Sequence, residues 1–287
     1  MTLPARLVES VSGDPPESPR RAWLAELPGL VRDLATRWRL RVGAPYQPGG
    51  STSWVAPAER DGEHLVLKLG WRHVESWHEA DALRVWAGAG AVRLLEARVD
   101  DRTDALLIEA CEPGEMLSRS LPPEQQDVVL AGLLRRLWVI PPSGHPFRPL
   151  ADMCAWWTEE FKRRPAPDLD PGLVRAGIDL LCALPVSAPR QTLLCTDLHP
   201  DNVLSARREP WLAIDPKPYV GDPTYDALQH MLNFPDRLAA DATGFADRMA
   251  GLLELDSRRL RLWLFARCVQ ESPDQRHQAR VAAALAP

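Results

Sequence analysis

Short apolar runs in the first half of the chain predict strands. Residues 64–69 alternate so that Leu65 and Leu67 can be buried on one face while Lys68 points to the other. An Asp-Gly pair at residues 61–62 precedes this run and is typical of a two-residue hairpin. The pattern therefore predicts a strand that begins after a tight turn and carries a lysine near its centre.

Other short runs extend the predicted strand content. Residues 91–99 and 105–110 are joined by a polar, turn-like segment and predict a second hairpin. In the second half, residues 191–195 and 202–205 predict strands on either side of a loop, and residues 209–214 predict a strand that returns beside them. These three runs are short, and the loop between the first two is more informative than the runs themselves.

Helical spacing of apolar residues dominates the rest of the sequence. The run at residues 121–140 has a pair of prolines at its start, at 122–123, and stops at another pair, as helix boundaries often do. The pattern predicts helices over residues 24–38, 74–89, 121–140, 151–161, 173–184, 222–233, 237–253 and 257–270. A part rich in strands is therefore followed by a part made mainly of helices.

Length and composition agree with two modest cores in one ordinary globular protein. A chain of 287 residues, 45% hydrophobic and 25% charged, is long enough for both. We expect a mobile lead-in at residues 1–20, a first lobe at 21–111 and a second lobe at 112–287. The sequence lacks a long apolar span and a secretory opening, and its five scattered cysteines indicate neither disulfides nor zinc, so a cytoplasmic location is expected.

The strongest chemical signal is a set of oxygen ligands in the second half. Asp197 is followed five positions later by Asn202, and Asp215 ends the next apolar run. Phosphoryl transfer needs a carboxylate that orients a hydroxyl, and it needs oxygen ligands for Mg²⁺. Asp197 suits the first task, and Asn202 and Asp215 suit the second. Lys217 could contact the transferred phosphate or acceptor, or could pair with a neighbouring carboxylate.

The first half offers groups that could hold a nucleotide. Backbone N–H groups of Gly49 and Gly50, with the hydroxyl of Ser51, could approach phosphates. Taken alone, such a segment is more often an ordinary surface turn, and only its place before a strand that carries a lysine favours the phosphate role. Lys68 is one of three lysines in the chain, and a compact ammonium suits phosphate pairing. The next predicted helix carries Glu75 and Glu79 one turn apart as possible partners for this lysine.

Three motifs resemble those of the aminoglycoside phosphotransferases, and most closely the branch of streptomycin 6-phosphotransferases and hydroxyurea phosphotransferase. They are DLHPDNVL at residues 197–204, WLAIDPKP at 211–218 and GDPTYD at 221–226. The resemblance implies an α+β, protein-kinase-like fold with a small, mainly β N-terminal lobe and a larger, mainly helical C-terminal lobe. It also implies ATP in the cleft, Mg²⁺ on the phosphates, and antibiotic inactivation as a role.

The same resemblance implies roles for particular residues. It favours Glu79 over Glu75 as the partner of Lys68, and it places the adenine edge against backbone groups near Glu109 and Cys111. The chain departs from the common family pattern at residues 195–196, where Cys-Thr replaces His-Gly before the catalytic aspartate. This exchange concerns the rigidity of the loop more than its chemistry.

The net charge of the chain indicates what kind of acceptor molecule it could bind. A net charge of −5 and a pI near 5.8 argue against a general nucleic-acid binder and suit a cationic small molecule, such as an aminoglycoside that carries guanidinium groups. For Asp222 and Asp226 a structural role is favoured, because the Gly-Asp-Pro segment is typical of a helix start with Asp as the N-cap. The candidate carboxylates for such an acceptor are Asp222, Asp226, Glu159, Glu160 and Glu271.

Three hypotheses follow. The first is an ATP-dependent phosphotransferase that acts on an aminoglycoside such as streptomycin. The second keeps this chemistry but has hydroxyurea or another metabolic alcohol as the acceptor. The third is a nucleotide-binding pseudokinase, which would have no need to keep Lys68, Asp197, Asn202 and Asp215 together.

Overall fold

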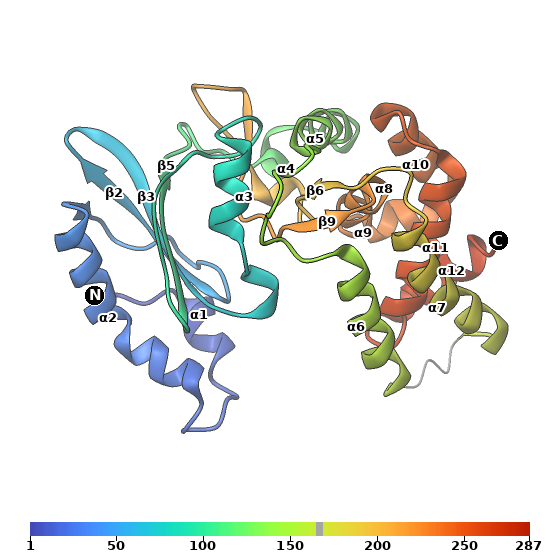
Figure 1. The fold of residues 1–287 in the computed structure, drawn as a ribbon, viewed down its shortest axis with the longest axis horizontal. Coiled ribbons are helices and arrows are strands. Elements are labelled where there is room, and N and C mark those ends of the chain that lie inside the picture. Colours follow the sequence, from blue (N-terminus) through green and yellow to red (C-terminus); the bar gives the residue numbers. More distant parts are fainter. Residues whose placement is uncertain (165–168) are drawn as a thin grey trace. The chain divides into compact units, whose positions relative to one another are not determined.

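The chain folds into two compact units, each with its own core. The computed structural model describes residues 1–164 and 169–287. Unit 1 comprises Met1–Gly114 with Ala206–Arg208, and unit 2 comprises Glu115–Ser205 with Glu209–Pro287. Unit 1 is built on a sheet and unit 2 is mainly helical (Figure 1), which confirms the predicted α+β class.

Unit 1 contains a five-stranded antiparallel sheet with the order β1-β2-β3-β5-β4. Both predicted hairpins are present. Asp61 and Gly62 have φ values of 53° and 84°, as a tight hairpin turn with two left-handed residues requires. The strands are β1 (Arg41–Val42), β2 (Ser53–Arg60), β3 (Glu63–Trp71), β4 (Leu94–Val99) and β5 (Thr103–Glu109).

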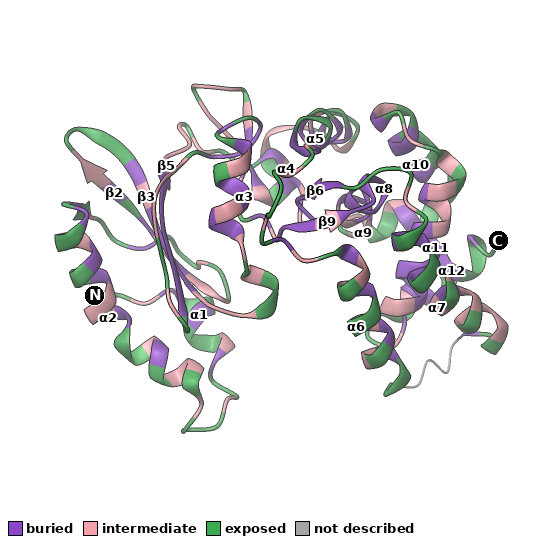
Figure 2. Ribbon diagram, viewed as in Figure 1, coloured by how far each residue is buried: buried purple, intermediate pink, exposed green. Residues whose placement is uncertain are grey.

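Helix α2 (Pro19–Arg37) packs its apolar side on this sheet. Trp23 and Leu27 of α2 and Leu67 of β3 are fully buried in one core, coloured purple in Figure 2. Leu65 is 3% exposed, so the predicted inward face of β3 is confirmed. The indole N–H of Trp23 donates a hydrogen bond of 3.2 Å to the hydroxyl of Thr103 on β5.

Two segments of unit 1 differ from the sequence expectation. Residues 1–20 include helix α1 (Ala5–Ser10), and Leu7 of this helix is fully buried in the core of unit 1. The single helix expected over residues 74–89 is wrong. It is replaced by the 3₁₀ turn η1 (Val74–Ser76) and helix α3 (Glu79–Trp86), because His78 has a φ of 70° and breaks the helical path.

Unit 2 surrounds two small antiparallel hairpin-like pairs, β6 with β9 and β7 with β8, with helices. Its strands are β6 (Thr192–Leu194), β7 (Val203–Ser205), β8 (Trp211–Ala213) and β9 (Tyr219–Gly221), and the 3₁₀ turn η2 covers Pro200–Asn202. Its helices are α4 (Leu117–Ser120), α5 (Pro123–Leu137), α6 (Leu150–Lys162), α7 (Pro171–Val186), α8 (Pro223–Asp226), α9 (Leu228–Leu232), α10 (Pro235–Leu253), α11 (Ser257–Glu271) and α12 (Arg276–Ala284).

Helix α11 is the centre of this core. Trp263, Leu264 and Phe265 of α11 are fully buried. Helix α7 lies against α11 so closely that a Cβ atom at Gly177 would stand 2.7 Å from three side-chain carbons of Val269. Among the described residues, no helix combines the length and the apolar character that a membrane crossing requires.

The close approach of α7 and α11 leads to a stability prediction. Gly177→Ala should lower the free energy of unfolding by about 1–3 kcal/mol, because the added methyl group overpacks the contact with Val269. Gly132→Ala is the matched control, since a Cβ at this position in α5 meets no atom within 4 Å. The control should be neutral or stabilising by up to about 1 kcal/mol. Urea denaturation of both variants measures the difference, and equal stability would contradict the packing argument.

Candidate active site

The loop that follows β6 carries the predicted catalytic aspartate. Backbone bonds fix its start: the N–H of Asp197 donates to the carbonyl of Cys195 at 2.8 Å, and so does the N–H of Lys217 at 2.9 Å. Thr196 adopts a φ of 51°, a left-handed conformation that is unfavourable for a β-branched residue. Its hydroxyl donates to the carbonyl of Lys217. The Cys-Thr departure from the family pattern therefore comes with a side-chain bond between the two loops.

Lys217 forms an ion pair with the catalytic candidate. Its Nζ lies 2.8 Å from Oδ2 of Asp197, and the two side chains are 33% and 16% exposed. Of the two possibilities that the sequence left open for Lys217, the structure has the pairing with a neighbouring carboxylate. This pair keeps Asp197 oriented while leaving it partly accessible.

Asn202 and Asp215 stand on adjoining segments of the same unit. The amide Nδ2 of Asn202 donates to the carbonyl of Asp197 at 3.0 Å, and the N–H of Ile214 donates to the carbonyl of Asn202 at 2.9 Å. Because its nitrogen is engaged, the amide of Asn202 presents its oxygen as the remaining donor atom for a cation. An amide oxygen and the carboxylate of Asp215 are hard ligands, so the residues fit Mg²⁺.

Within residues 1–164 and 169–287, no group of three or more His, Cys, Asp or Glu side chains is arranged to hold a metal ion. A two-ligand protein site is nevertheless the usual form for Mg²⁺ bound with a nucleotide, because phosphate oxygens and water complete the octahedron.

The carboxylate of Asp226, at the end of α8, anchors the start of the loop that carries Asp197. It accepts hydrogen bonds from the backbone N–H of Cys195 at 3.0 Å and of Thr196 at 2.6 Å. The indole N–H of Trp138 donates a third bond of 3.0 Å. Asp226 is fully buried, so it cannot bind an acceptor; it is a structural residue, although it anchors a loop and does not cap a helix.

Burial raises the pKa of Asp226 to about 6, although the three hydrogen bonds favour the ionised form and oppose this rise. At neutral pH the group therefore carries its charge and remains an acceptor for all three donors. The neighbouring thiol of Cys195 is fully buried, and burial together with nearby carboxylates raises its pKa well above the usual value. Cys195 is thus an inert core residue rather than a nucleophile.

The other candidate acceptor carboxylates also have protein partners. Asp222 is fully buried, caps α8 and accepts bonds from Arg259 at 2.6 Å and from Trp263 at 2.7 Å, so its helix-start interpretation is confirmed. The remaining pairs are Glu159 with Lys162, Glu160 with Arg163 and Glu271 with Arg267. The exposed pairs on α6 can exchange with solvent, whereas Asp222 cannot.

In unit 1, Lys68 is paired with Glu79. The Nζ of Lys68 lies 2.7 Å from both carboxylate oxygens of Glu79, and the residues are 7% and 5% exposed. Glu75 lies in η1, its side chain is 54% exposed, and its carboxylate is 3.8 Å from His73. The structure therefore brings the lysine together with Glu79, the residue that the family resemblance favoured.

The glycine-containing turn between β1 and β2 is attached to the N-terminal segment. Ser51 presents its carbonyl to the hydroxyl of Ser10 at 2.6 Å and to Arg20 at 2.7 Å. Gly49 has a φ of 76°, and a Cβ there would stand 2.5 Å from Cβ of Pro4. Gly49 is thus required for close packing in unit 1, while the neighbouring Gly50 is exposed and compatible with a phosphate contact.

The segment expected to bind adenine is bonded within unit 1. The N–H of Glu109 donates to the carbonyl of Arg93 at 3.0 Å, and its carboxylate accepts bonds from Arg208 at 2.6 and 3.1 Å. Burial raises the pKa of Cys111 to about 12, so its thiol stays protonated at neutral pH. Because the N–H of Glu109 is engaged, its carbonyl oxygen is the backbone group available for a contact with adenine. Cys111 remains a candidate for such a contact through its backbone groups.

Sequence reasoning missed two anchors, Asp226 as the support of the catalytic loop and Arg208 as the partner of Glu109. Asp226 belongs to the GDPTYD motif, and this was the available signal, but its buried donors come from segments distant in sequence. Arg208 follows another arginine in a polar turn, and the sequence offers no signal that separates the two.

Comparison with solved structures identifies the fold. The chain superimposes on the choline kinase LicA of Streptococcus pneumoniae with a TM-score of 0.60, over 90% of this chain and 95% of that one, at 13% sequence identity. Such a likeness establishes the fold alone. With the α+β architecture described above, it confirms the protein-kinase-like fold.

Sequence comparison identifies the family. Residues 37–277 match the family described as aminoglycoside/hydroxyurea antibiotic resistance kinase, and the chain belongs to it. It is 36% identical to a streptomycin 6-kinase of Streptomyces glaucescens, over 88% of this chain and 84% of the relative. It is 38% identical to a hydroxyurea phosphotransferase of Kitasatospora aureofaciens, over 87% and 73%. The protein is therefore a small-molecule phosphotransferase.

The anchoring role of Asp226 can be tested by Asp226→Asn. An amide turns an N–H group toward at least one buried donor, so we expect kcat to fall at least about tenfold and the free energy of unfolding at pH 7 to fall by about 1–3 kcal/mol. The measurements are initial rates and urea denaturation. Asp179→Asn, an exposed change on α7, is the control.

The same variant has a pH signature. Because the folded-state pKa of Asp226 is about 6 and its ordinary value is 3.8, the folded protein binds more protons between these values, and this group's contribution to stability falls as pH rises from about 4 to 6. Asp226→Asn should remove that part of the pH dependence. A stability profile identical in slope to the wild type would contradict the raised pKa.

Proposed function

We propose that this protein transfers the γ-phosphoryl group of ATP to a hydroxyl group of an aminoglycoside of the streptomycin type. The observation that carries the proposal is the arrangement in unit 2, where Asp197 is oriented by Lys217 and bonded through its carbonyl to Asn202. A streptomycin 6-kinase that is 36% identical over most of both chains supports the choice of acceptor.

In this proposal, the residues of unit 2 carry the chemistry. Asp197 accepts the hydrogen bond of the acceptor hydroxyl, orients it toward the phosphorus atom and takes its proton. Asn202 and Asp215 would hold Mg²⁺, which when bound neutralises charge on the phosphate oxygens. Lys217 keeps the Asp197 carboxylate in one orientation through their 2.8 Å contact. Positioning of this kind accounts for most of the barrier reduction in phosphoryl transfer.

The residues of unit 1 would bind the nucleotide. Lys68, held by two bonds of 2.7 Å to Glu79, would bring its ammonium group to the phosphate oxygens. A buried ammonium paired in this way is already desolvated and fixed, so phosphate binding costs little further ordering. Gly50 and Ser51 would add backbone and hydroxyl donors, and Cys111 would meet the adenine edge through its backbone.

The acceptor is the less constrained part of the proposal. A net charge of −5 suits a cation, but the buried Asp222 and Asp226 are excluded as its ligands. Hydroxyurea is the second candidate, supported by a hydroxyurea phosphotransferase that is 38% identical over 257 residues. Hydroxyurea is small and uncharged, so it would not need the acidic balance of the chain.

The decisive experiment is a product assay over a panel of acceptors. Mg²⁺-ATP is incubated with streptomycin, hydroxyurea, other aminoglycosides and simple alcohols, and ADP release is followed together with mass spectrometry of each product. We expect an ADP release rate that depends on streptomycin and a product heavier by one phosphoryl group. Phosphorylated hydroxyurea instead would establish the second candidate, and no acceptor-dependent product with nucleotide still bound would favour a pseudokinase.

A variant of the proposed base separates chemistry from binding. Asp197→Ala should lower kcat by about 10²–10⁴, the usual contribution of a positioned acid–base group, and should leave nucleotide affinity within about threefold. Rapid-quench rates and calorimetric titration of a nonhydrolysable ATP analogue measure the two effects. Asp236→Ala, an exposed carboxylate on α10, should match the wild type in both. Wild-type turnover in Asp197→Ala would remove this residue from the mechanism.

A further inference from the structure

Helix α3, which carries Glu79, does not fix its own position. It has eight residues, and its N-cap His78 has a φ of 70° and makes no side-chain capping bond. A helix of two turns is unstable in isolation, because few hydrogen bonds offset the cost of nucleation. Contacts with the rest of unit 1 must therefore determine where the carboxylate of Glu79 lies.

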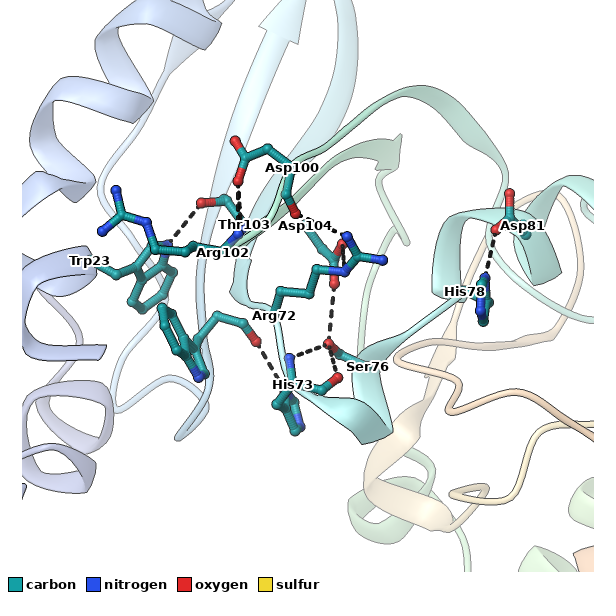
Figure 3. Close-up of polar contacts among 11 residues, drawn as sticks. Trp23, Arg72, His73, Ser76, His78, Asp81, Asp100, Arg102, Thr103 and Asp104 are labelled. Atoms are coloured by element: carbon teal, nitrogen blue, oxygen red, sulfur yellow. Dashed lines mark hydrogen bonds and ion pairs between the residues drawn. The ribbon is translucent and has the colours of Figure 1, made fainter. Parts of the chain in front are cut away.

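Asp104 of β5 makes such a contact with the turn just before α3. The hydroxyl of Ser76, in η1, lies 3.1 Å from Oδ2 of Asp104 and 3.0 Å from the carbonyl of His73 (Figure 3). A carboxylate is the stronger acceptor of the two for the single hydroxyl hydrogen. The N–H of His73 in turn donates to the Ser76 oxygen at 3.1 Å. Ser76 thus links the backbone of this turn to the sheet.

Arg72 completes the polar cluster at Asp104. Its Nε is 3.8 Å from Oδ1 of Asp104, and its Nη1 donates to the carbonyl of Asp100 at 3.0 Å. Asp104 is 7% exposed, and burial raises its pKa even though Ser76, Arg72 and Lys68 act in the opposite direction. A buried carboxylate at this position is costly without such partners, so its contacts with the turn before α3 are not incidental.

Strand register places Asp104 on the face that carries the lysine. In the β3–β5 ladder Gly70 lies opposite Asp104 and Lys68 lies opposite Leu106. Directly opposed residues share a face and side chains alternate along a strand, so Lys68 and Asp104 point to the same side of the sheet. Glu79 comes from the helix on that side, three residues after Ser76.

Apolar packing leaves room at this end of α3. A small pocket with a volume of about 30 Å³ lies there, and Glu79 and Asp104 both line it. The space admits little more than a water molecule, so it is no site for an organic ligand. Asp81 binds His78 at 3.1 Å and Arg84 at 2.8 Å within the helix, and these pairs do not attach α3 to the sheet. Ala82, Leu83 and Trp86 are buried and hold the body of α3, so the bond between Ser76 and Asp104 bears on its N-terminal end.

We infer that Ser76 and Asp104 are positioning residues for phosphoryl transfer: their hydrogen bond sets the start of α3 and thereby holds Glu79 against Lys68. The inference rests on the proposed function of Lys68 as a phosphate ligand. Loss of the bond lets α3 shift at its N-terminus, so Glu79 holds Lys68 less firmly and the affinity for the nucleotide falls. The acceptor side of the reaction is not affected.

The test is Ser76→Ala, which removes the hydroxyl and leaves the charge of Asp104 in place. We expect the Kd of a nonhydrolysable ATP analogue with Mg²⁺, and the KM for ATP, to rise about tenfold, the effect of losing a hydrogen bond to a charged group. The KM for the acceptor should not change. Ser76→Thr, which keeps the hydroxyl, should restore affinity, and Arg84→Ala, an exposed change on the same helix, should match the wild type.

A double-mutant cycle separates positioning from general stability. If Ser76 acts through Glu79, then Ser76→Ala should have little further effect on nucleotide affinity in a Glu79→Gln background. The inference would be overturned if Ser76→Ala weakened nucleotide binding by the same factor in the wild type and in the Glu79→Gln background. It would also be overturned if Ser76→Ala alone bound nucleotide with wild-type affinity. Either result would leave the proposed function intact. Calorimetry needs no acceptor, so a wild-type protein that binds no nucleotide would overturn both.

Discussion

The hydrogen bonds to the buried carboxylate of Asp226 are the constraint on which the conformation of the Asp197 loop depends. A loop that presents a candidate catalytic group must be rigid. This loop nevertheless contains Thr196 in an unfavourable left-handed conformation, so contacts from outside the loop must hold it. Two backbone N–H groups of this loop and the indole of Trp138 converge on the one carboxylate. Because these donors are buried, releasing them is costly, and the strain at Thr196 is retained.

This anchor explains how one strand pair can position several groups. The β6–β9 pairing sets the start of the catalytic loop beside the segment that carries Lys217, and cross-loop bonds then fix Asn202 relative to Asp197. Asp197 and Lys217 orient each other, and the amide of Asn202 is bonded to the backbone of Asp197. Preorganised groups of this kind suit phosphoryl transfer, in which the protein contributes position and charge more than covalent chemistry.

Unit 1 uses a different solution for the same need. Its lysine is paired with a carboxylate from a two-turn helix, and Ser76 in the turn before that helix is hydrogen-bonded to Asp104 of the sheet. The glycine-containing turn is likewise held from outside, through the carbonyl of Ser51 and the N-terminal segment. Both elements are short, so tertiary bonds rather than local propensity determine their conformation.

The sequence by itself determined the strand and hairpin at Lys68, the α+β order of elements and the spacing of Asp197, Asn202 and Asp215, because these depend on local periodicity, turn chemistry and family motifs. It did not show that the helix expected over residues 74–89 is broken into a 3₁₀ turn and a shorter helix. It also did not show that Asp226 is a buried anchor of a loop. Only the tertiary structure decided these points. A buried charge is identified by its partners, and those partners come from elements far apart in the chain.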